Sequence, residues 1–140
     1  MEISLKVYGE PIAQPRHKVG VLHGKARTYL PKSDPVHQFK HDLKMAAACE
    51  FMEAELVNCP ISLKCLFLMS RPQRLIWKKR PMVREPHTSR PDTDNLIKAV
   101  KDALTGVVYR DDSLIWSEEI QKMYAAGDER PQTVVTLSWA

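Results

Sequence analysis

The first pattern along the chain is an alternation of apolar and polar residues. The odd-numbered positions within residues 2–8 are apolar and their neighbours are mostly polar, which predicts a strand with one buried face. Residues 61–69 are almost continuously apolar, which is typical of a strand near the centre of a sheet. Similar stretches predict two further strands, over residues 114–124 and 132–139.

Apolar residues at helical spacing predict two helices. Asp34-Pro35 is a favourable helix start, because Asp accepts a hydrogen bond at the N-cap and proline suits the first helical position. The apolar residues that follow predict a helix to about Leu56. A second helix is predicted to begin near Asp94 and to end at Gly106, a common C-terminal cap, since its apolar residues recur three and four positions apart.

Two long stretches between these elements lack a clean period. Residues 9–32 contain repeated prolines and glycines and predict a loop, with a short hairpin as an option. Residues 70–90 contain three prolines and predict a long loop, which in a compact domain is usually functional or disordered. Residues 107–109 are predicted to be extended and residues 110–113 to form a turn. The expected fold is α/β (α+β), a single domain over 1–140 with two main helices packed on one mixed sheet.

Composition narrows the class of protein. The 140 residues are 44% hydrophobic and 27% charged, the ordinary balance of a folded domain. No run of about 18 apolar residues occurs, so we expect no membrane span. The N-terminus fits neither a signal peptide nor a transit peptide, and the three cysteines fit neither a common zinc pattern nor a disulfide framework. We therefore expect a reducing compartment, the cytoplasm.

The net charge of +4 is unevenly distributed. Residues 71–90 contain seven Lys or Arg and one acid, whereas residues 91–130 contain nine acids and five bases. A basic flank beside an acid-rich segment suits a polyanion bound next to a cation site. A solvated run of charges is the simpler interpretation of composition alone.

The densest chemistry lies around the start of the second predicted helix. Asp92 and Asp94 are two positions apart in an extended segment, so both side chains can point the same way. The strand after the helix can bring Asp112 back beside this pair. Three close carboxylates repel one another unless a cation lies among them, and magnesium suits such an oxygen site. Lys98 lies one helical turn further on, near enough to meet a phosphate oxygen.

Each of these residues also has a simpler interpretation. Asp94 could cap the helix, and Lys98 could form an ordinary surface ion pair with it. Asp111 and Asp112 could be turn residues and nothing more.

Two other constellations carry weaker signals. His37 and His41 are four positions apart on the first predicted helix and could ligate a metal, but no nearby Glu or Cys completes the site. Trp77 lies among basic residues and could stack on an unpaired base. Packing of its loop onto the protein or onto a dimer partner is the alternative.

Residues 90–104, RPDTDNLIKAVKDAL, and residues 106–112, GVVYRDD, closely resemble the RusA-type Holliday junction resolvases, which are often carried by bacteriophages and prophages. The resemblance is strongest over residues 90–124. It extends more loosely to residues 9–16 and to the helix after Pro35. An Asp-x-Asp pair alone is weak evidence, whereas Asp-x-Asp-Asn-Leu-x-Lys with a downstream Asp-Asp is specific.

The resemblance implies a homodimeric endonuclease that cuts four-way DNA junctions with Mg²⁺ or Mn²⁺, in DNA recombination and repair. The products would carry 5′-phosphate and 3′-hydroxyl ends, and the enzyme would act in the cytoplasm of a bacterial or phage-infected cell. The family's catalytic, metal-binding carboxylates fall on Asp92, Asp94 and Asp112, and its active-site lysine falls on Lys98. Asp111 and Lys122 are secondary candidates.

Basic residues before the motif are expected to bind DNA phosphates, which would make the affinity fall steeply with salt. They are Arg16, Lys18, Arg71, Arg74, Lys78, Lys79, Arg80, Arg84 and Arg90, with Lys25 and Arg27 beside them. Two alternatives stay open. One is a magnesium-dependent nuclease for a flap or another branched DNA, and the other is a module that binds branched DNA without cutting it.

Overall fold

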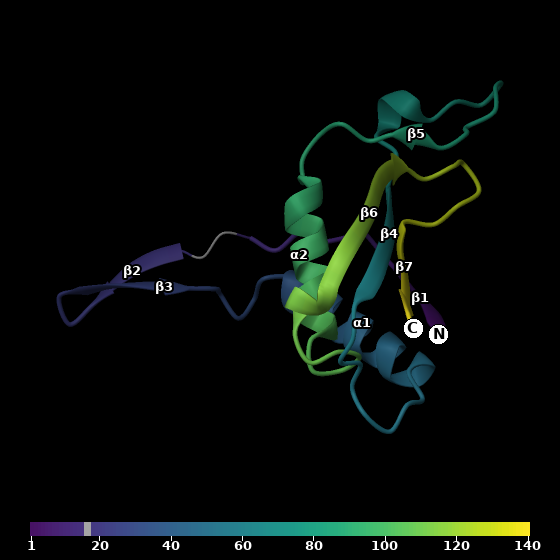
Figure 1. Ribbon diagram of the computed structural model, residues 1–140. Helices are drawn as coiled ribbons and strands as arrows, with labels where there is room; N and C mark the ends of the chain where they lie inside the picture. Colours follow the sequence, from purple (N-terminus) through teal and green to yellow (C-terminus); the bar gives the residue numbers. More distant parts are fainter. Residues whose placement is uncertain (16–17) are drawn as a thin grey trace.

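A five-stranded mixed sheet forms the centre of the protein (Figure 1). This computed structural model describes residues 1–15 and 18–140, without the side chains of residues 18–20, 22 and 27–29. The strand order is β1-β7-β4-β6-β5, with β4 and β6 parallel and the other neighbours antiparallel. The strands are β1 (Glu2–Tyr8), β4 (Ile61–Met69), β5 (Glu85–Pro86), β6 (Ile115–Tyr124) and β7 (Gln132–Trp139). The apolar strand β4 lies in the middle of the sheet, as its composition predicts.

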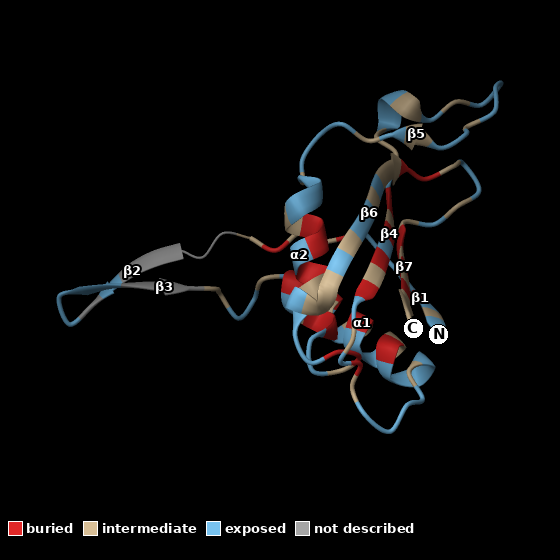
Figure 2. Ribbon diagram, viewed as in Figure 1, coloured by how far each residue is buried: buried red, intermediate tan, exposed pale blue. Residues whose placement is uncertain are grey.

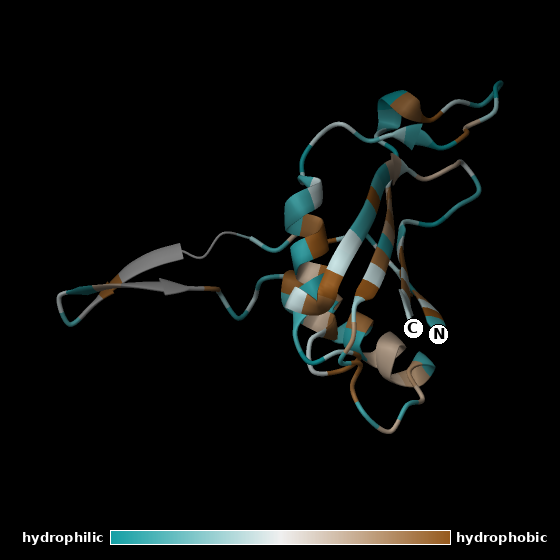
Figure 3. Cartoon of the chain, viewed as in Figure 1, coloured by the Kyte–Doolittle hydropathy of each residue, from teal (hydrophilic) through white to brown (hydrophobic). Residues whose placement is uncertain are grey.

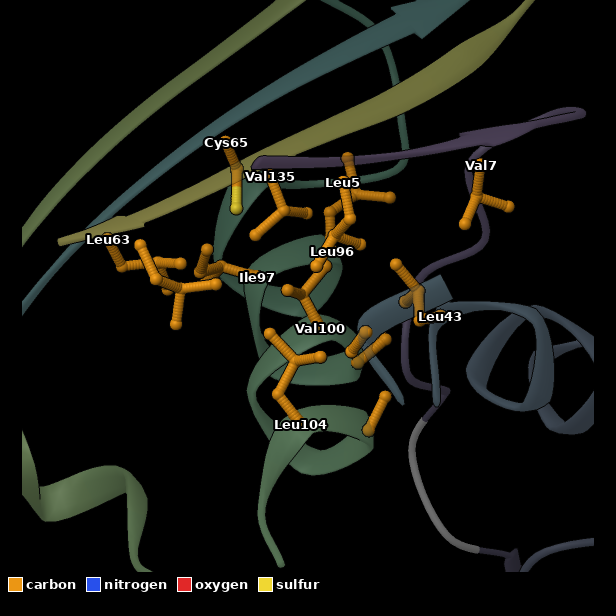
Figure 4. Packing of buried hydrophobic residues seen from close by; sticks show 14 of the residues in the cluster. Leu5, Val7, Leu43, Leu63, Cys65, Leu96, Ile97, Val100, Leu104 and Val135 are labelled. Atoms are coloured by element: carbon orange, nitrogen blue, oxygen red, sulfur yellow. The ribbon is translucent and has the colours of Figure 1, made fainter. Parts of the chain in front are cut away.

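Helices α1 (Val36–Glu50) and α2 (Thr93–Leu104) pack on the same face of the sheet. Leu96 and Val100 of α2 are fully buried in one apolar cluster that also contains Leu63 and Cys65 of β4 and Leu43 of α1 (Figure 4). Burial of each such side chain contributes roughly 1.5–3 kcal/mol relative to exposure. The buried part of α2 is its inner face, whereas its first turn is exposed and hydrophilic (Figures 2 and 3). The α+β class with a mixed sheet and two helices is confirmed.

Helix α1 begins one residue later than the sequence predicts, with Pro35 rather than Asp34 in the N-cap position, and it ends earlier. Asp34 Oδ1 accepts a hydrogen bond from the backbone N–H of Val36 at 2.9 Å. The helix stops at Glu50 rather than near Leu56, because Phe51 turns the chain into an extended conformation and its ring meets Trp139 edge-on at 6.1 Å. Continuing the helix would have added further glutamates at its negative end, which is unfavourable.

The region between β1 and α1 contains the hairpin that was an option from the sequence. Strands β2 (Lys18–Leu22) and β3 (Lys25–Tyr29) pair with each other and project away from the sheet (Figure 1). The two residues of the turn, His23 and Gly24, both have positive φ, of 53° and 75°. This is the turn geometry that matches the twist of a two-residue hairpin.

The segment between α2 and β6 is a turn, and not the short extended stretch expected over residues 107–109. Gly106, at φ 82°, donates its backbone N–H to the carbonyl of Tyr109 at 2.8 Å. The buried Tyr109 hydroxyl donates to the Lys101 carbonyl at 2.8 Å, so it holds the end of α2, and burial raises its pKa. The predicted turn at 110–113 is confirmed, with a short 3-10 helix at Asp112–Leu114. Within the described ranges, no helix is long and apolar enough to cross a lipid bilayer.

Candidate active site at the amino end of helix α2

Asp92 and Asp94 lie together at the amino end of α2. Asp92 is in the N-cap position, and its carbonyl accepts the first helical hydrogen bond from Leu96 at 3.1 Å, yet its side chain makes no capping bond. Asp94 lies in the first turn, so it is not the cap of the helix. Both side chains are exposed, and among the described residues neither carboxylate has a hydrogen bond or an ion pair. Two carboxylates without a partner among the described residues are therefore available to a ligand.

Lys122 of β6 holds the segment that leads into Asp92. Its Nζ donates hydrogen bonds to the carbonyls of Ser89 and Pro91, at 2.5 and 2.6 Å. Just before them, the backbone N–H of His87 donates to the Lys122 carbonyl at 2.9 Å. Burial and the positive charge of Lys122 both lower the pKa of His87. Lys122 is therefore not a freely exposed strand lysine, because its ammonium group supports the segment that leads into the carboxylate pair.

The other side of this segment borders a hollow of about 590 Å³ between residues 13–15 and 90–92, with Asn95 at its edge. The backbone N–H of Gln14 donates to the Asn95 carbonyl at 2.9 Å, which attaches the N-terminal loop to α2. Gln14 is only 7% exposed. Sequence reasoning missed it, because a glutamine in a proline-rich loop is ordinarily exposed.

Lys98 extends from the exposed face of α2 one turn beyond Asp94. Its Nζ lies 3.9 Å from Asp102, and its side chain is 60% exposed. No ion pair with Asp94 forms, contrary to the simpler interpretation of this spacing. An exposed pair four residues apart contributes only about 0.3–0.5 kcal/mol, so Lys98 can leave Asp102 for a phosphate at little cost.

Asp112 lies at the far end of α2 from Asp92 and Asp94. Twelve helical residues separate the two ends, or about 18 Å. Strand β6 begins beside Asp112 and approaches Asp92 only at Lys122. The expectation that the connection returns Asp112 to the pair within one chain is therefore wrong, because the returning strand is as long as the helix.

Asp111 is used locally. Its carboxylate accepts a hydrogen bond from the backbone N–H of Ser113 at 2.9 Å, and this bond lowers its pKa. Its interpretation as a turn residue agrees with this contact.

The donor chemistry at Asp92 and Asp94 fits a magnesium ion. Mg²⁺ is usually held by one or two carboxylates, keeps several waters and binds substrate phosphates. Over residues 1–15 and 18–140, no three His, Cys, Asp or Glu side chains lie together in a way that could hold a metal. One chain could therefore offer a metal ion at this end of α2 at most two carboxylates from the described residues. His37 and His41 likewise belong to no cluster of three or more metal-ligating side chains among those residues, and His37 Nε2 is hydrogen-bonded to the Pro31 carbonyl at 2.9 Å.

The predicted DNA-binding residues differ in their exposure and in their contacts. Arg74, Lys78, Lys79, Arg80 and Arg90 are exposed and make no ion pair within the part of the chain that the structure describes. Arg84 makes a two-pronged contact with Glu129, at 2.9 and 2.6 Å, which lowers the pKa of Glu129 to about 2. Arg16 lies outside the described residues, as do the side chains of Lys18 and Arg27, whereas Lys25 is exposed.

Arg71 differs from this surface group. Its side chain is only 5% exposed, and its guanidinium donates to the carbonyls of Leu75, Val83 and Ala125, at 2.9, 2.7 and 3.0 Å. It therefore fastens the 70–90 loop to the end of β6 and does not face solvent, because a lone guanidinium can satisfy several loop carbonyls at once.

Trp77 packs within the same loop. The guanidinium of Arg80 lies 3.9 Å from its ring centroid and that of Arg71 lies 5.3 Å from it. These contacts support the packing interpretation of Trp77 over base stacking.

Replacing Arg71 by methionine is expected to loosen this loop without unfolding the protein. The change leaves three carbonyls without a donor, and each unpaired buried carbonyl costs roughly 1–3 kcal/mol. Trypsin cleavage after Lys78 or Lys79 should then accelerate at least about tenfold, since each 1.4 kcal/mol is a factor of ten in the open population. Arg74→Met, which removes an exposed arginine of the same loop, is the matched control. Equal cleavage rates for the two variants would contradict the anchoring role.

Comparison with known proteins adds to this geometry. A sequence model of the family described as endodeoxyribonuclease RusA matches residues 8–138. The uncharacterized protein YqaN of Bacillus subtilis (strain 168) is 29% identical over 140 residues, which cover 96% of this chain and 94% of that protein. The family match includes the carboxylate pair at the start of α2 and the whole sheet except most of β1 and the last residue of β7. The chain belongs to the RusA family of endodeoxyribonucleases.

Proposed function

We propose that this endonuclease resolves four-way DNA junctions by paired, symmetric nicks, using Mg²⁺ or Mn²⁺. The observation that carries the proposal is the pair of unpartnered carboxylates, Asp92 and Asp94, at the amino end of α2 with the exposed cation of Lys98 one turn away. The family match supports a DNA phosphodiester as the substrate.

Each residue of the site has a distinct task in this proposal. Asp92 and Asp94 hold the cation with their oxygens, and the entry segment stays in place through the bonds of Lys122 to Ser89 and Pro91. When bound, the metal ion supplies positive charge against the cleaved phosphate and makes water more acidic. Lys98 neutralises part of the charge that develops on that phosphate.

A dimer accounts for two features that one chain leaves unexplained. A four-way junction has two-fold symmetry and requires two matched nicks, which suits two identical subunits. Asp112 lies beyond the far end of α2, a helix about 18 Å long, so it would complete the site of Asp92 and Asp94 only from a second copy.

The free edge of β6 is a suitable contact for such a dimer. Strand β5 covers only its last two residues, so the outer edge from Ile115 to Gln121 has no strand partner among the described residues. Trp116 on this strand is 72% exposed. Unpaired edges readily pair with another chain. An antiparallel pair of β6 strands would set the start of one strand beside the end of the other, which brings Asp112 of the partner subunit toward Asp92.

The exposed lysine and arginine side chains of residues 74–90 and the projecting β2–β3 hairpin would hold the DNA backbone (Figure 1). Such contacts make binding salt-dependent. The three cysteines are free thiols, as suits action on DNA in the cytoplasm of a bacterial or phage-infected cell.

The test is a cleavage assay with three labelled substrates, a synthetic four-way junction, a flap and a linear duplex, each with Mg²⁺ or with EDTA. We expect paired nicks at symmetric positions of the junction, dependent on Mg²⁺, and a mass in solution of two chains. Cleavage of the flap in preference to the junction would indicate a nuclease for other branched DNA. Binding of the junction without any metal-dependent cleavage would overturn the nuclease proposal in favour of a binding module.

A further inference from the structure

The hollow beside Asp92 has the character of a small ligand site. Its walls include the apolar residues Ala13, Pro15 and Pro91, and polar groups of Gln14 and Asn95 lie between them. A volume of about 590 Å³ is within the usual range of such pockets and accommodates a single nucleotide unit. Because Asp92 lines it, a ligand held there lies next to the carboxylate pair.

Gln14 supplies a second, independent observation. The residue is more than nine-tenths buried, and its Oε1 has no hydrogen-bond partner among the described residues. Its backbone is held at the wall of the hollow by the bond from its N–H to the Asn95 carbonyl on α2. A buried acceptor without a partner costs roughly 1–3 kcal/mol, which favours a small turn of the side chain toward a donor in the hollow that it lines.

The chemistry of that donor can be narrowed. The phosphate and deoxyribose oxygens within a DNA strand are acceptors, so the backbone of DNA does not satisfy Oε1. A second cation is disfavoured because Arg90 lines the same hollow and Asp92 is its sole carboxylate. The edge of a nucleobase does fit, since it carries N–H donors and has apolar faces that suit walls of proline and alanine. A glutamine amide pairs best with a base that has an amino group next to a ring nitrogen, as in adenine or cytosine.

We propose that this hollow receives one nucleobase of the strand being cut, and that Gln14 selects an adenine or a cytosine there. The inference rests on the proposed function for the identity of the strand. Seating the base beside Asp92 fixes the neighbouring phosphate relative to the carboxylates, so the position of the nick follows the sequence. Gln14 is thereby a specificity-determining residue for the reaction.

The first arm of the test maps nick positions on junctions whose branch point migrates through all base combinations. The unaltered protein should favour adenine or cytosine at one fixed distance from the nick by about tenfold or more, which matches the discrimination of a good two-bond base contact. Gln14→Met keeps the length of the side chain and removes its acceptor, and it should reduce that preference to less than threefold. Gln38→Met, on the surface of α1, is the matched control and should leave the preference unchanged.

The second arm does not depend on cleavage. Binding is measured in EDTA with the preferred base intact and with the same base lacking its amino group. We expect at least a fivefold loss of affinity for the unaltered protein and none for Gln14→Met. If Gln14→Met does not fold, the affinities of the unaltered protein for the two bases decide the question.

An identical nick distribution and equal binding of the two bases would overturn the inference and leave water as the partner of Oε1. Junction cleavage with no Gln14-dependent preference would remove this inference and leave the proposed function standing. Base-selective binding in EDTA without any junction cleavage in Mg²⁺ would support this inference and overturn the proposed function.

Discussion

Asp94→Asn is expected to slow junction nicking at least about a thousandfold while the protein still binds the junction. The substitution keeps the shape of the side chain but removes one of two negative oxygen ligands. The stabilisation that a bound metal gives the transition state amounts to several kcal/mol, and each 1.36 kcal/mol is a factor of ten in rate. Binding should persist or tighten, because less negative charge faces the phosphates. Single-turnover nicking and gel-shift titration in EDTA measure the two effects.

Asp128→Asn is a matched control for this change. Asp128 is an exposed acid in the turn before β7, at a distance along the chain from the α2 motif. The Asp128→Asn variant should nick the junction at the rate of the unaltered protein. The melting temperature of Asp94→Asn should fall by no more than about 4 °C, since only its interaction with the helix dipole is lost. Loss of junction binding together with a large drop in melting temperature would instead identify Asp94 as a structural residue.

Lys98→Ala should reduce the nicking rate by about 10²–10³-fold with a near-normal fold. A preorganised cation aimed at developing charge typically contributes an effect of this size. The side chain is 60% exposed and has only a long ion pair with Asp102, so its removal affects stability little. The measurement pairs single-turnover kinetics with thermal unfolding.

Lys64→Ala tests whether the effect is specific to the position. Lys64 is 65% exposed and forms one ion pair with Glu119 at 3.3 Å, so it matches Lys98 in exposure and partners but lies on β4. A comparable loss of rate in this variant would indicate a general effect of charge on DNA binding and would argue against a role for Lys98 at the site.

The chain itself predicts the carboxylate pair and the helix that carries it, because both depend on local signals. The Asp-x-Asp spacing and the helical recurrence of apolar residues after it are visible over a dozen residues, although Asp94 lies in the first helical turn and not in the extended segment that the sequence predicts. The position of Asp112 is a different matter. It depends on the direction and length of β6 relative to α2, which only the assembled sheet determines. The expected proximity of Asp112 to Asp92 and Asp94 rests on the order of the elements along the chain. That order does not specify which end of β6 lies beside the amino end of α2.

The basic stretch shows a second limit of sequence reasoning. Arg71 and Arg74 are indistinguishable by composition, yet Arg71 is buried among carbonyls and Arg74 is exposed. The difference arises from where the loop folds back on the end of β6, a long-range contact with no local signature. The burial of Gln14 is not predictable from the sequence for the same reason, since it comes from docking of the N-terminal loop on α2.

The bonds from Lys122 to Ser89 and Pro91 have a consequence for how this enzyme can evolve. They make the approach to the carboxylates an extension of the sheet, so the loop before it can change in length and charge without displacing the reactive groups. In the proposed function, the exposed basic residues before Ser89 would hold the DNA backbone, and they are mechanically separate from the carboxylates, though adjacent in sequence. That stretch could change between relatives while the segment that carries Asp92 stays in place.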